Sequence, residues 1–166
     1  MGDIKPDPID DILRQWRRER PDLDLRALGL MGRLFRVVQL AEARLAPPLR
    51  ALGLEAGWFD VLAALRRTPA PHELNPTELL RTVLLTSGGM TKRLDRLLDA
   101  GLIERRADPD DRRGTLVRLS RKGKALIDKA VAMHGENEAQ ILAALTAAER
   151  RELDRLLRKL NDELAN

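Results

Sequence analysis

The chain has 166 residues, of which 43% are hydrophobic and 34% charged, and its formal net charge is +4. This is the length of one ordinary domain with a real core, and the composition suits a largely helical protein. The absence of cysteine excludes a disulfide framework and a thiol-based redox sensor. The start lacks the apolar run of a secretory signal, and no stretch is apolar for long enough to span a membrane. We therefore expect a cytoplasmic protein.

The first fifty residues predict a loose tail followed by two helices. Residues 1–8 hold two prolines and two aspartates, as a mobile tail often does. A short helix is expected from Ile9 to Arg20, because its apolar residues share one face and Pro21 must end it. On that face Trp16 is either a core or interface residue or, as discussed below, part of a binding site.

A longer helix is expected from Arg26 to Leu45, where apolar residues recur at helical spacing. Pro47-Pro48 should kink or break it, because proline has no N–H to donate and its ring clashes with the preceding turn. A third helix is expected from Glu55 to Arg67. Asp60 lies among its apolar residues, which leaves two readings: an exposed acid on the polar side, or a partly buried carboxylate that needs a cationic partner.

The middle of the chain has the spacing of a helix-turn-helix. Residues 68–74 read as a loop, and Asn75-Pro76-Thr77-Glu78 combines a capping residue, a proline in the first turn and a glutamate three residues after the cap. The helix that it starts should be short, to about Val83. A longer helix should begin near Ser87, although Gly88-Gly89 lowers helix propensity at its start.

The stretch from Ser87 to Ser120 reads as a helix, a closing glycine at 101, a strand, a charged turn over residues 108–114 and a second strand. Residues 87–124 hold 11 Lys/Arg and 6 Asp/Glu, a net charge of +5, whereas the remaining 19 Lys/Arg and 20 Asp/Glu give −1. A helix followed by a hairpin with arginines at its tip, and with the positive charge concentrated there, is typical of a winged helix-turn-helix that binds DNA.

The C-terminal part predicts further helices. One is expected from Arg121 to Gly135, where the glycine relaxes it, and the capping box Thr146-Ala147-Ala148-Glu149 should open a last helix to about Leu164. The apolar stripe of this last helix is too large for a small winged domain to cover alone. We therefore expect the first two and last two helices to interleave with a second copy in a symmetric dimer, the alternative being a monomeric bundle.

The expected fold is thus mainly α with a small β-hairpin, in three regions. Residues 1–53 form an extra helix and a long dimerisation helix, residues 54–120 the winged helix-turn-helix, and residues 121–166 the C-terminal dimerisation helices. We expect no enzyme, cofactor or metal site, because His72 and His134 are isolated in sequence and no phosphate loop is present. Both histidines read as surface or capping residues.

The segments NPTELLRTV and SGGMTKRLDRLLDAGLIERRADPDDRRGTLVRLSRKGKAL resemble those of the MarR family of dimeric winged-helix regulators. The extra N-terminal helix with its tryptophan is similar to that of the PecS-type, urate-responsive branch. The resemblance implies a ligand site formed by Trp16, Asp60, Arg93 and Arg105. These residue types suit a flat heterocyclic anion, because an indole offers an apolar face and arginines offer forked donors to anionic oxygens.

The same resemblance implies two sets of DNA contacts. The start of the recognition helix would enter the major groove with Ser87, Thr91, Lys92 and Arg96. The wing would lie over the minor groove, with Arg113 as its probe and Asp111 as the brace of that arginine. Arg112 would contact a phosphate or assist Arg113.

Three hypotheses of function remain open from the sequence. The first is a homodimeric repressor that a small anion, urate or a related purine, releases from a pseudo-palindromic operator. The second is a repressor of the same kind that responds to a phenolic or carboxylic acid. The third is a DNA-binding protein that responds to no ligand.

Overall fold

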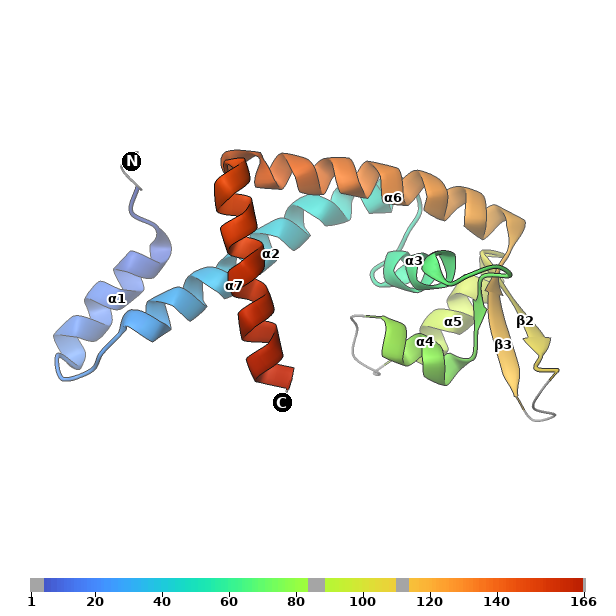
Figure 1. Cartoon of the computed structure of the whole chain (residues 1–166), viewed down its shortest axis with the longest axis horizontal. Helices are drawn as coiled ribbons and strands as arrows, with labels where there is room; N and C mark the ends of the chain where they lie inside the picture. The colour runs from blue at the N-terminus through green and yellow to red at the C-terminus, as the bar shows by residue number, and fades with distance from the viewer. Residues whose placement is uncertain (1–4, 84–88, 110–113, 166) are drawn as a thin grey trace. The chain divides into compact units, whose positions relative to one another are not determined.

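The computed structural model describes residues 5–83, 89–109 and 114–165. It confirms the predicted fold class, since helices dominate and one small antiparallel sheet is present (Figure 1). The chain divides into two compact units, residues 1–44 and 45–166. Within the described ranges, no helix is long and apolar enough to cross a membrane.

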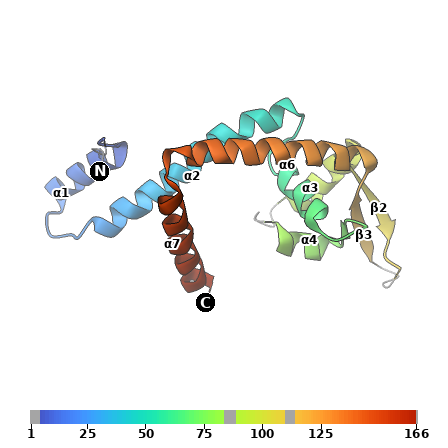
Figure 2. The same cartoon turned by 45° about the horizontal axis from the view of Figure 1, so that its top comes forward.

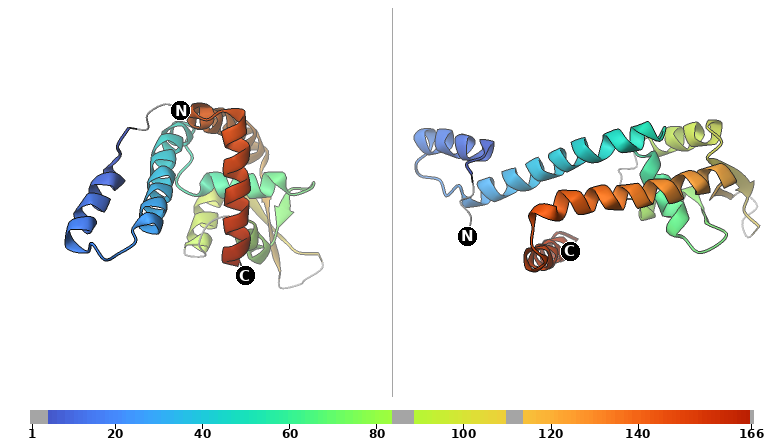
Figure 3. Two further views of the ribbon diagram at one scale, coloured as in Figure 1. Left: turned by 60° about the vertical axis from the view of Figure 1, so that its left-hand side comes forward. Right: turned by 90° about the horizontal axis from the view of Figure 1, so that it is seen from above.

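In the first unit, α1 (Pro8–Glu19) lies beside the first turns of α2 (Arg26–Ala51), as Figure 1, Figure 2 and Figure 3 all show. Two glycines of α2 allow this close approach. A Cβ placed on Gly29 would lie 2.9 Å from a methyl carbon of Leu13, and one on Gly32 would lie 3.3 Å from Ile9. Ile9 and Leu13 are buried there together with Leu25. The helices therefore pack through the glycines and not through the apolar stripe of α2.

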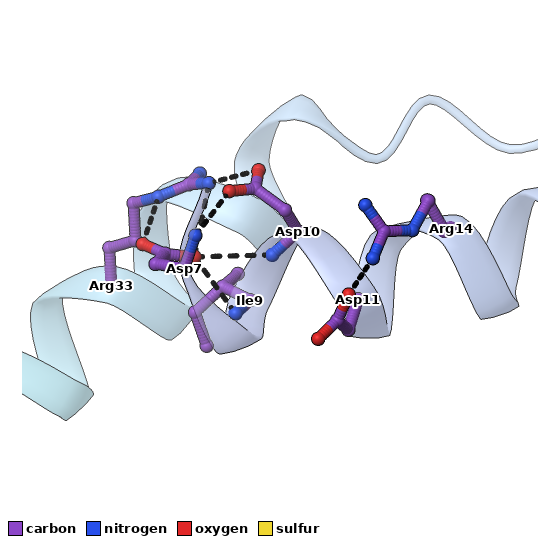
Figure 4. Close-up of polar contacts among 6 residues, drawn as sticks. All are labelled: Asp7, Ile9, Asp10, Asp11, Arg14 and Arg33. Carbon is purple, nitrogen blue, oxygen red and sulfur yellow. Dashed lines mark hydrogen bonds and ion pairs between the residues drawn. The ribbon is translucent and has the colours of Figure 1, made fainter. Parts of the chain in front are cut away.

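An arginine of α2 fastens the start of α1 (Figure 4). Asp7 and Asp10 form a capping box, in which each carboxylate accepts from the other residue's backbone N–H. Arg33 donates from Nε to Asp7 Oδ2 at 2.9 Å and from a terminal nitrogen to Asp10 Oδ1 at 2.5 Å. The Asp7 N–H and then Arg33 hold the pKa of Asp10 below its ordinary value. One guanidinium thus ties the cap of α1 to α2.

Of the predicted kink or break at Pro47-Pro48, the break is wrong. Both prolines lie inside α2, which continues to Ala51. Because proline has no N–H, the carbonyl oxygens of Ala43 and Arg44 lack their usual helical donors. The helix nevertheless continues to Ala51, and Gly53 follows it with a φ of 77°.

The second unit is a winged helix-turn-helix followed by two further helices. In chain order its elements are α3 (Trp58–Arg67), β1 (Glu73–Leu74), α4 (Pro76–Thr82), α5 (Met90–Asp99), β2 (Ile103–Ala107), β3 (Thr115–Leu119), α6 (Arg121–Ile141), the short 3-10 helix η1 (Leu142–Ala144) and α7 (Ala147–Ala165). Its core is made by apolar residues of α3, α4, α5, the hairpin and α6, among which Leu62, Leu65, Leu79, Leu97, Ile103, Val117 and Ile127 are fully buried.

Local signals set two of the helix starts as predicted. Asn75 and Glu78 cap α4 reciprocally, and Thr146 and Glu149 do the same before α7. The predicted starts of α3 and α5 are each three residues early. Gly57 and Gly89 directly precede these helices with φ values of 75° and 84°, which are not helical and which glycine adopts without strain.

The sheet has the order β1-β3-β2, with both pairs antiparallel. The prediction that residues 68–74 are only a loop is wrong, because Glu73 and Leu74 pair with Arg118 and Val117 of β3. Arg106 of β2 reaches across to Glu73 and donates to both of its carboxylate oxygens, from Nε at 2.7 Å and also from a terminal nitrogen. This pair joins the two outer strands over the central one.

The carboxylate of Glu73 should make stability depend on pH. Its side chain is only 10% exposed, and the hydrogen bonds from Arg106 lower its pKa from about 4.5. A depressed folded pKa adds stability above the unfolded value, and this is lost as the pH falls through the folded value. Glu73→Gln should therefore cost about 1–2 kcal/mol at neutral pH, with the deficit shrinking in acid. Urea unfolding at neutral and at acidic pH measures this difference in the free energy of unfolding, and Glu104→Gln, at an exposed position, is the control. An equal deficit at the two pH values would contradict the stabilising role of the Glu73 carboxylate.

The last two helices extend from the winged part. The prediction that α6 relaxes at Gly135 is wrong, since the helix continues to Ile141. It runs past α3, whereas α7 leaves its end and lies apart from α3 and α4 in Figure 1 and Figure 2. No residue of α7 is buried, and its large apolar side chains are between 38% and 84% exposed: Leu153, Leu156, Leu157, Leu160 and Leu164.

Candidate functional site

The recognition helix α5 has an apolar face that is buried and a basic face that is exposed. Met90, Leu94 and Leu97 are buried in the core. Of the predicted DNA contacts, Thr91, Lys92 and Arg96 are exposed on this helix, while Ser87 lies outside the described residues. No acidic side chain occupies the first turn of α5, so the positive end of the helix dipole has no acidic partner there.

The wing is described up to its tip. Its strands pair from Ile103 opposite Leu119 to Ala107 opposite Thr115. Beyond them the N–H of Asp108 donates to the carbonyl oxygen of Gly114 at 3.0 Å. The predicted minor-groove residues Asp111, Arg112 and Arg113 lie outside the described residues.

Arg105 turns toward the recognition helix. It lies on β2 at the same parity as buried Ile103, opposite buried Val117, and its guanidinium donates to Asp95 of α5 at 2.7 Å. Arg106 and Glu104 lie on the other face of the sheet, where they pair with Glu73 and Arg118. The alternation of a strand thus assigns Arg105 to the helix side.

Arg93 and Arg96 lie in a pocket of 230 Å³ between the start of α3 and the start of α5, lined by Glu55, Ala56, Trp58, Gly89, Lys92, Arg93 and Arg96. A Cβ on Gly57 would lie 2.6 Å from Nε of Arg93, so a larger residue there would displace this guanidinium from its present position. One terminal nitrogen of Arg93 is buried without a partner among the described residues. Arg96 forms an ion pair with Glu55 at 2.9 Å.

Asp60 lines a different cavity, of 680 Å³, between α3 and α6. It is partly buried, and two cations of the same helix, Arg66 and Arg67, share the cavity with it. Arg66 is engaged by Asp128 of α6 at 2.5 Å, and Arg67 donates to the carbonyl oxygen of Thr82. No hydrogen bond or ion pair to Asp60 comes from the part of the chain that the structure describes.

The same cavity contains a histidine that the sequence predicts to be a surface or capping residue. The side chain of His134 is only 16% exposed, and its ring lies 4.4 Å from that of Phe59 between centroids. Its Nε2 is 3.3 Å from Glu138, while Nδ1 is buried without a partner among the described residues. The sequence gives little indication that His134 faces a cavity, because only the helical spacing of its apolar neighbours places it on that side of α6. His72 instead closes the end of α3, where its Nδ1 donates to the carbonyl oxygen of Thr68 at 2.8 Å.

The four predicted ligand residues thus do not line one common pocket in the described structure. Trp16 lies on α1 in the first unit and is 43% exposed. Asp60 and Arg93 line separate cavities, and Arg105 is held by Asp95. The sequence did not indicate Glu55, which lines the pocket of Arg93, or Arg66 and Arg67, which line the cavity of Asp60. Among the described residues, no group of three side chains is arranged to hold a metal ion.

The comparisons with known proteins agree with this architecture. A model of the MarR family matches residues 52–114. The HTH-type transcriptional regulator PecS of Dickeya dadantii is 37% identical over 158 residues, which covers 95% of both chains. A mutant of the Escherichia coli protein MarR, solved in complex with operator DNA, is 31% identical with a TM-score of 0.71 and covers 82% of this chain and 96% of that one.

A third similar structure concerns Bordetella bronchiseptica BpsR, whose DNA binding is regulated by 6-hydroxynicotinic acid. It is 27% identical with a TM-score of 0.70, and the match covers 79% of this chain and 91% of that one. A mainly helical winged helix-turn-helix with a basic recognition helix defines the class of DNA-binding transcriptional regulators. This chain belongs to the MarR family. Its relatives are transcriptional regulators, which confirms the expectation that it is not an enzyme.

Proposed function

We propose that this chain is a homodimeric repressor that binds a pseudo-palindromic operator and leaves it when a small planar anion binds. The observation that carries the DNA-binding part is the exposed basic face of α5 beside a paired hairpin. The relative from Escherichia coli that was solved with operator DNA has the same architecture. Thr91, Lys92 and Arg96 would meet the major groove together with Ser87, and Arg113 would probe the minor groove with Asp111 and Arg112 beside it.

The uncovered apolar faces support the homodimer. Along α7, five leucines stay exposed, and α2 exposes Leu30, Phe35 and Val37 by 69%, 61% and 59%. Contiguous apolar patches of this kind are rare on monomers, and a second copy of the chain offers the same faces in return. Two copies related by a two-fold axis would also match the symmetry of a palindromic operator.

The ligand site would combine Trp16, Asp60, Arg93 and Arg105, as the resemblance implies. Two observations support an anionic ligand. One nitrogen of Arg93 is buried without a partner among the described residues, and among these residues Arg105 is held by an exposed aspartate that an anion can replace. The carboxylate of Asp60 would instead accept from an N–H of the ligand. Urate or a related purine has both N–H donors and anionic oxygens, which are the groups that such residues bind.

Release from DNA would follow by linkage. Arg93 lies on the recognition helix, and Arg105 is paired with Asp95 of that helix. A ligand that draws these arginines toward itself favours a shifted position of α5. Its preference for that position lowers the DNA affinity by the same free energy, and no direct competition for the groove is required.

A second candidate ligand is an aromatic carboxylic or phenolic acid. The 680 Å³ cavity supports an aromatic ligand, because the rings of Phe59 and His134 form an aromatic wall. Two cations, Arg66 and Arg67, and the carboxylates of Asp60, Asp128 and Glu138 also line it. The size suits a small molecule. The regulation of BpsR by 6-hydroxynicotinic acid supports a ligand of this class.

The test is a titration of the complex between the full chain and the DNA upstream of its own gene. Urate, xanthine and simple phenolic acids are added separately at constant ionic strength. Release by urate or xanthine supports the purine, and release by the phenolic acids alone supports the second candidate. Unchanged binding with every compound would leave a DNA-binding protein that responds to none of them.

Variants of two proposed ligand residues should separate the ligand response from DNA binding. Asp60→Ala and Arg105→Ala are expected to fold and to bind the operator, but to need about tenfold more ligand for release, because each loses a hydrogen bond to a charged group. Fluorescence anisotropy of labelled operator measures both affinities. Arg118→Ala is the control, since this arginine pairs with Glu104 on the opposite face of the sheet. A wild-type response in both variants would contradict the site.

A further inference from the structure

The pocket between the start of α3 and the start of α5 has an unusual balance of charge. Three cations line it, Lys92, Arg93 and Arg96, against the single carboxylate of Glu55. One nitrogen of Arg93 is buried there with no partner among the described residues, although a guanidinium cannot lose its charge. A buried N–H without an acceptor costs free energy, so the pocket is arranged for an acceptor that the described residues do not supply.

The two helix ends add to this. A glycine directly precedes each of α3 and α5, Gly57 and Gly89, and neither helix start has a side chain that caps its free N–H groups. Each helix is ten residues long and has the positive end of its dipole at this end. Asp60 lies in the first turn of α3, whereas the first turn of α5 contains no acid. The volume of 230 Å³ suits a compact group better than a ring system with substituents. The electrostatics and the size therefore favour a small tetrahedral or planar oxyanion.

Glu55 supplies the carboxylate that pairs with a cation of this pocket. Its Oε2 lies 2.9 Å from a terminal nitrogen of Arg96, and both side chains are about half exposed, at 54% and 53%. The pair is therefore weak, and another anion can replace the carboxylate at little cost. Arg96 is also a predicted DNA contact, so the same guanidinium cannot serve Glu55 and a phosphate fully at once.

We propose that this pocket is an oxyanion site of the phosphate class and that Glu55 is its internal competitor. The DNA phosphodiester is one source of such a group, and a free phosphate-like anion is the other. In the free protein Glu55 holds Arg96, and an incoming phosphate oxygen takes over that guanidinium and the free N–H of Arg93. The part that concerns DNA rests on the proposed function, whereas the binding of a free anion does not.

The first arm of the test uses inorganic phosphate without DNA. The chain has two tryptophans, so Trp16→Phe leaves Trp58, which lines the pocket, as the single fluorescent reporter. Phosphate is titrated against chloride at matched ionic strength, and the thermal midpoint is recorded in parallel. We expect a saturable change of Trp58 emission with phosphate, tighter in Glu55→Gln and lost in Arg96→Ala.

The second arm measures operator affinity in a double-mutant cycle. Glu55→Gln should tighten binding about two- to fivefold, which is the scale of an exposed ion pair. In the Arg96→Ala background the same change should have no effect, because the competition acts through that guanidinium. Asp99→Asn, at the other end of α5, is the control for the loss of one negative charge.

The outcomes separate the two sources. A phosphate response with unchanged operator affinity assigns the site to a free anion, and a Glu55 effect on DNA without a phosphate response assigns it to the phosphodiester. The proposal is overturned if phosphate gives no saturable signal and Glu55→Gln binds DNA as Asp99→Asn does. Weaker binding by Glu55→Gln overturns the role of Glu55 as a competitor. If the wild-type chain binds no DNA, the proposed function fails, and the phosphate arm alone decides the site.

Discussion

Gly123→Ala is expected to destabilise the winged part by about 3 kcal/mol, near the upper end for overpacking a core. Gly123 is the third residue of α6 and is buried, and a Cβ there would overlap the carbonyl oxygen of Leu102. That oxygen also accepts from the N–H of Ser120 at 3.1 Å, and Ser120 Oγ donates to Gly101 and accepts from Gly123. Backbone is thus pressed against backbone, and neither side can move without losing hydrogen bonds.

Chemical unfolding at equilibrium measures this effect. The control is Gly135→Ala in the same helix, where a Cβ would meet nothing within 4 Å. That change should raise stability by up to about 1 kcal/mol, since alanine favours a helix over glycine. Equal changes in the free energy of unfolding for the two substitutions would show that helix propensity determines both effects. The contact of Gly123 with Leu102 would then not be tightly packed.

Replacing Leu156 and Leu160 of α7 by glutamate is expected to separate the proposed dimer and to weaken operator binding more than about 100-fold. Both side chains are nearly half exposed in the single chain, so the change removes nothing from its own core. In the dimer, four carboxylates would be buried at the interface, where unpaired charges are strongly unfavourable. A monomer then binds one half-site without the local concentration that the second half-site provides.

Light scattering after size exclusion measures the mass, which should fall to that of one 18.7 kDa chain. Arg151→Glu, on the opposite face of α7, is the matched control and should leave the mass unchanged. A double variant that stays dimeric would refute the assignment of α7 to the interface. A monomer with undiminished affinity for the operator would refute the need for two copies.

The elements that the sequence predicts well are those with local causes. The capping boxes at Asn75 and Thr146 place α4 and α7, because the cap and its partner are three residues apart. The hairpin follows from two short apolar runs on either side of a turn-forming segment. The missed strand Glu73–Leu74 has two residues and exists only because β3 offers it a partner more than forty positions away.

For the candidate site, the sequence by itself determined the residue types and the concentration of positive charge within residues 87–124. Only the tertiary structure decided their surroundings. It placed Asp60 and Arg93 in separate cavities, packed the ring of His134 against that of Phe59 and paired Glu55 with Arg96, forty-one residues away. Periodicity tells which side of a helix or strand is apolar. It does not tell which side chains of other elements meet there, since those contacts depend on packing between segments that are distant in sequence.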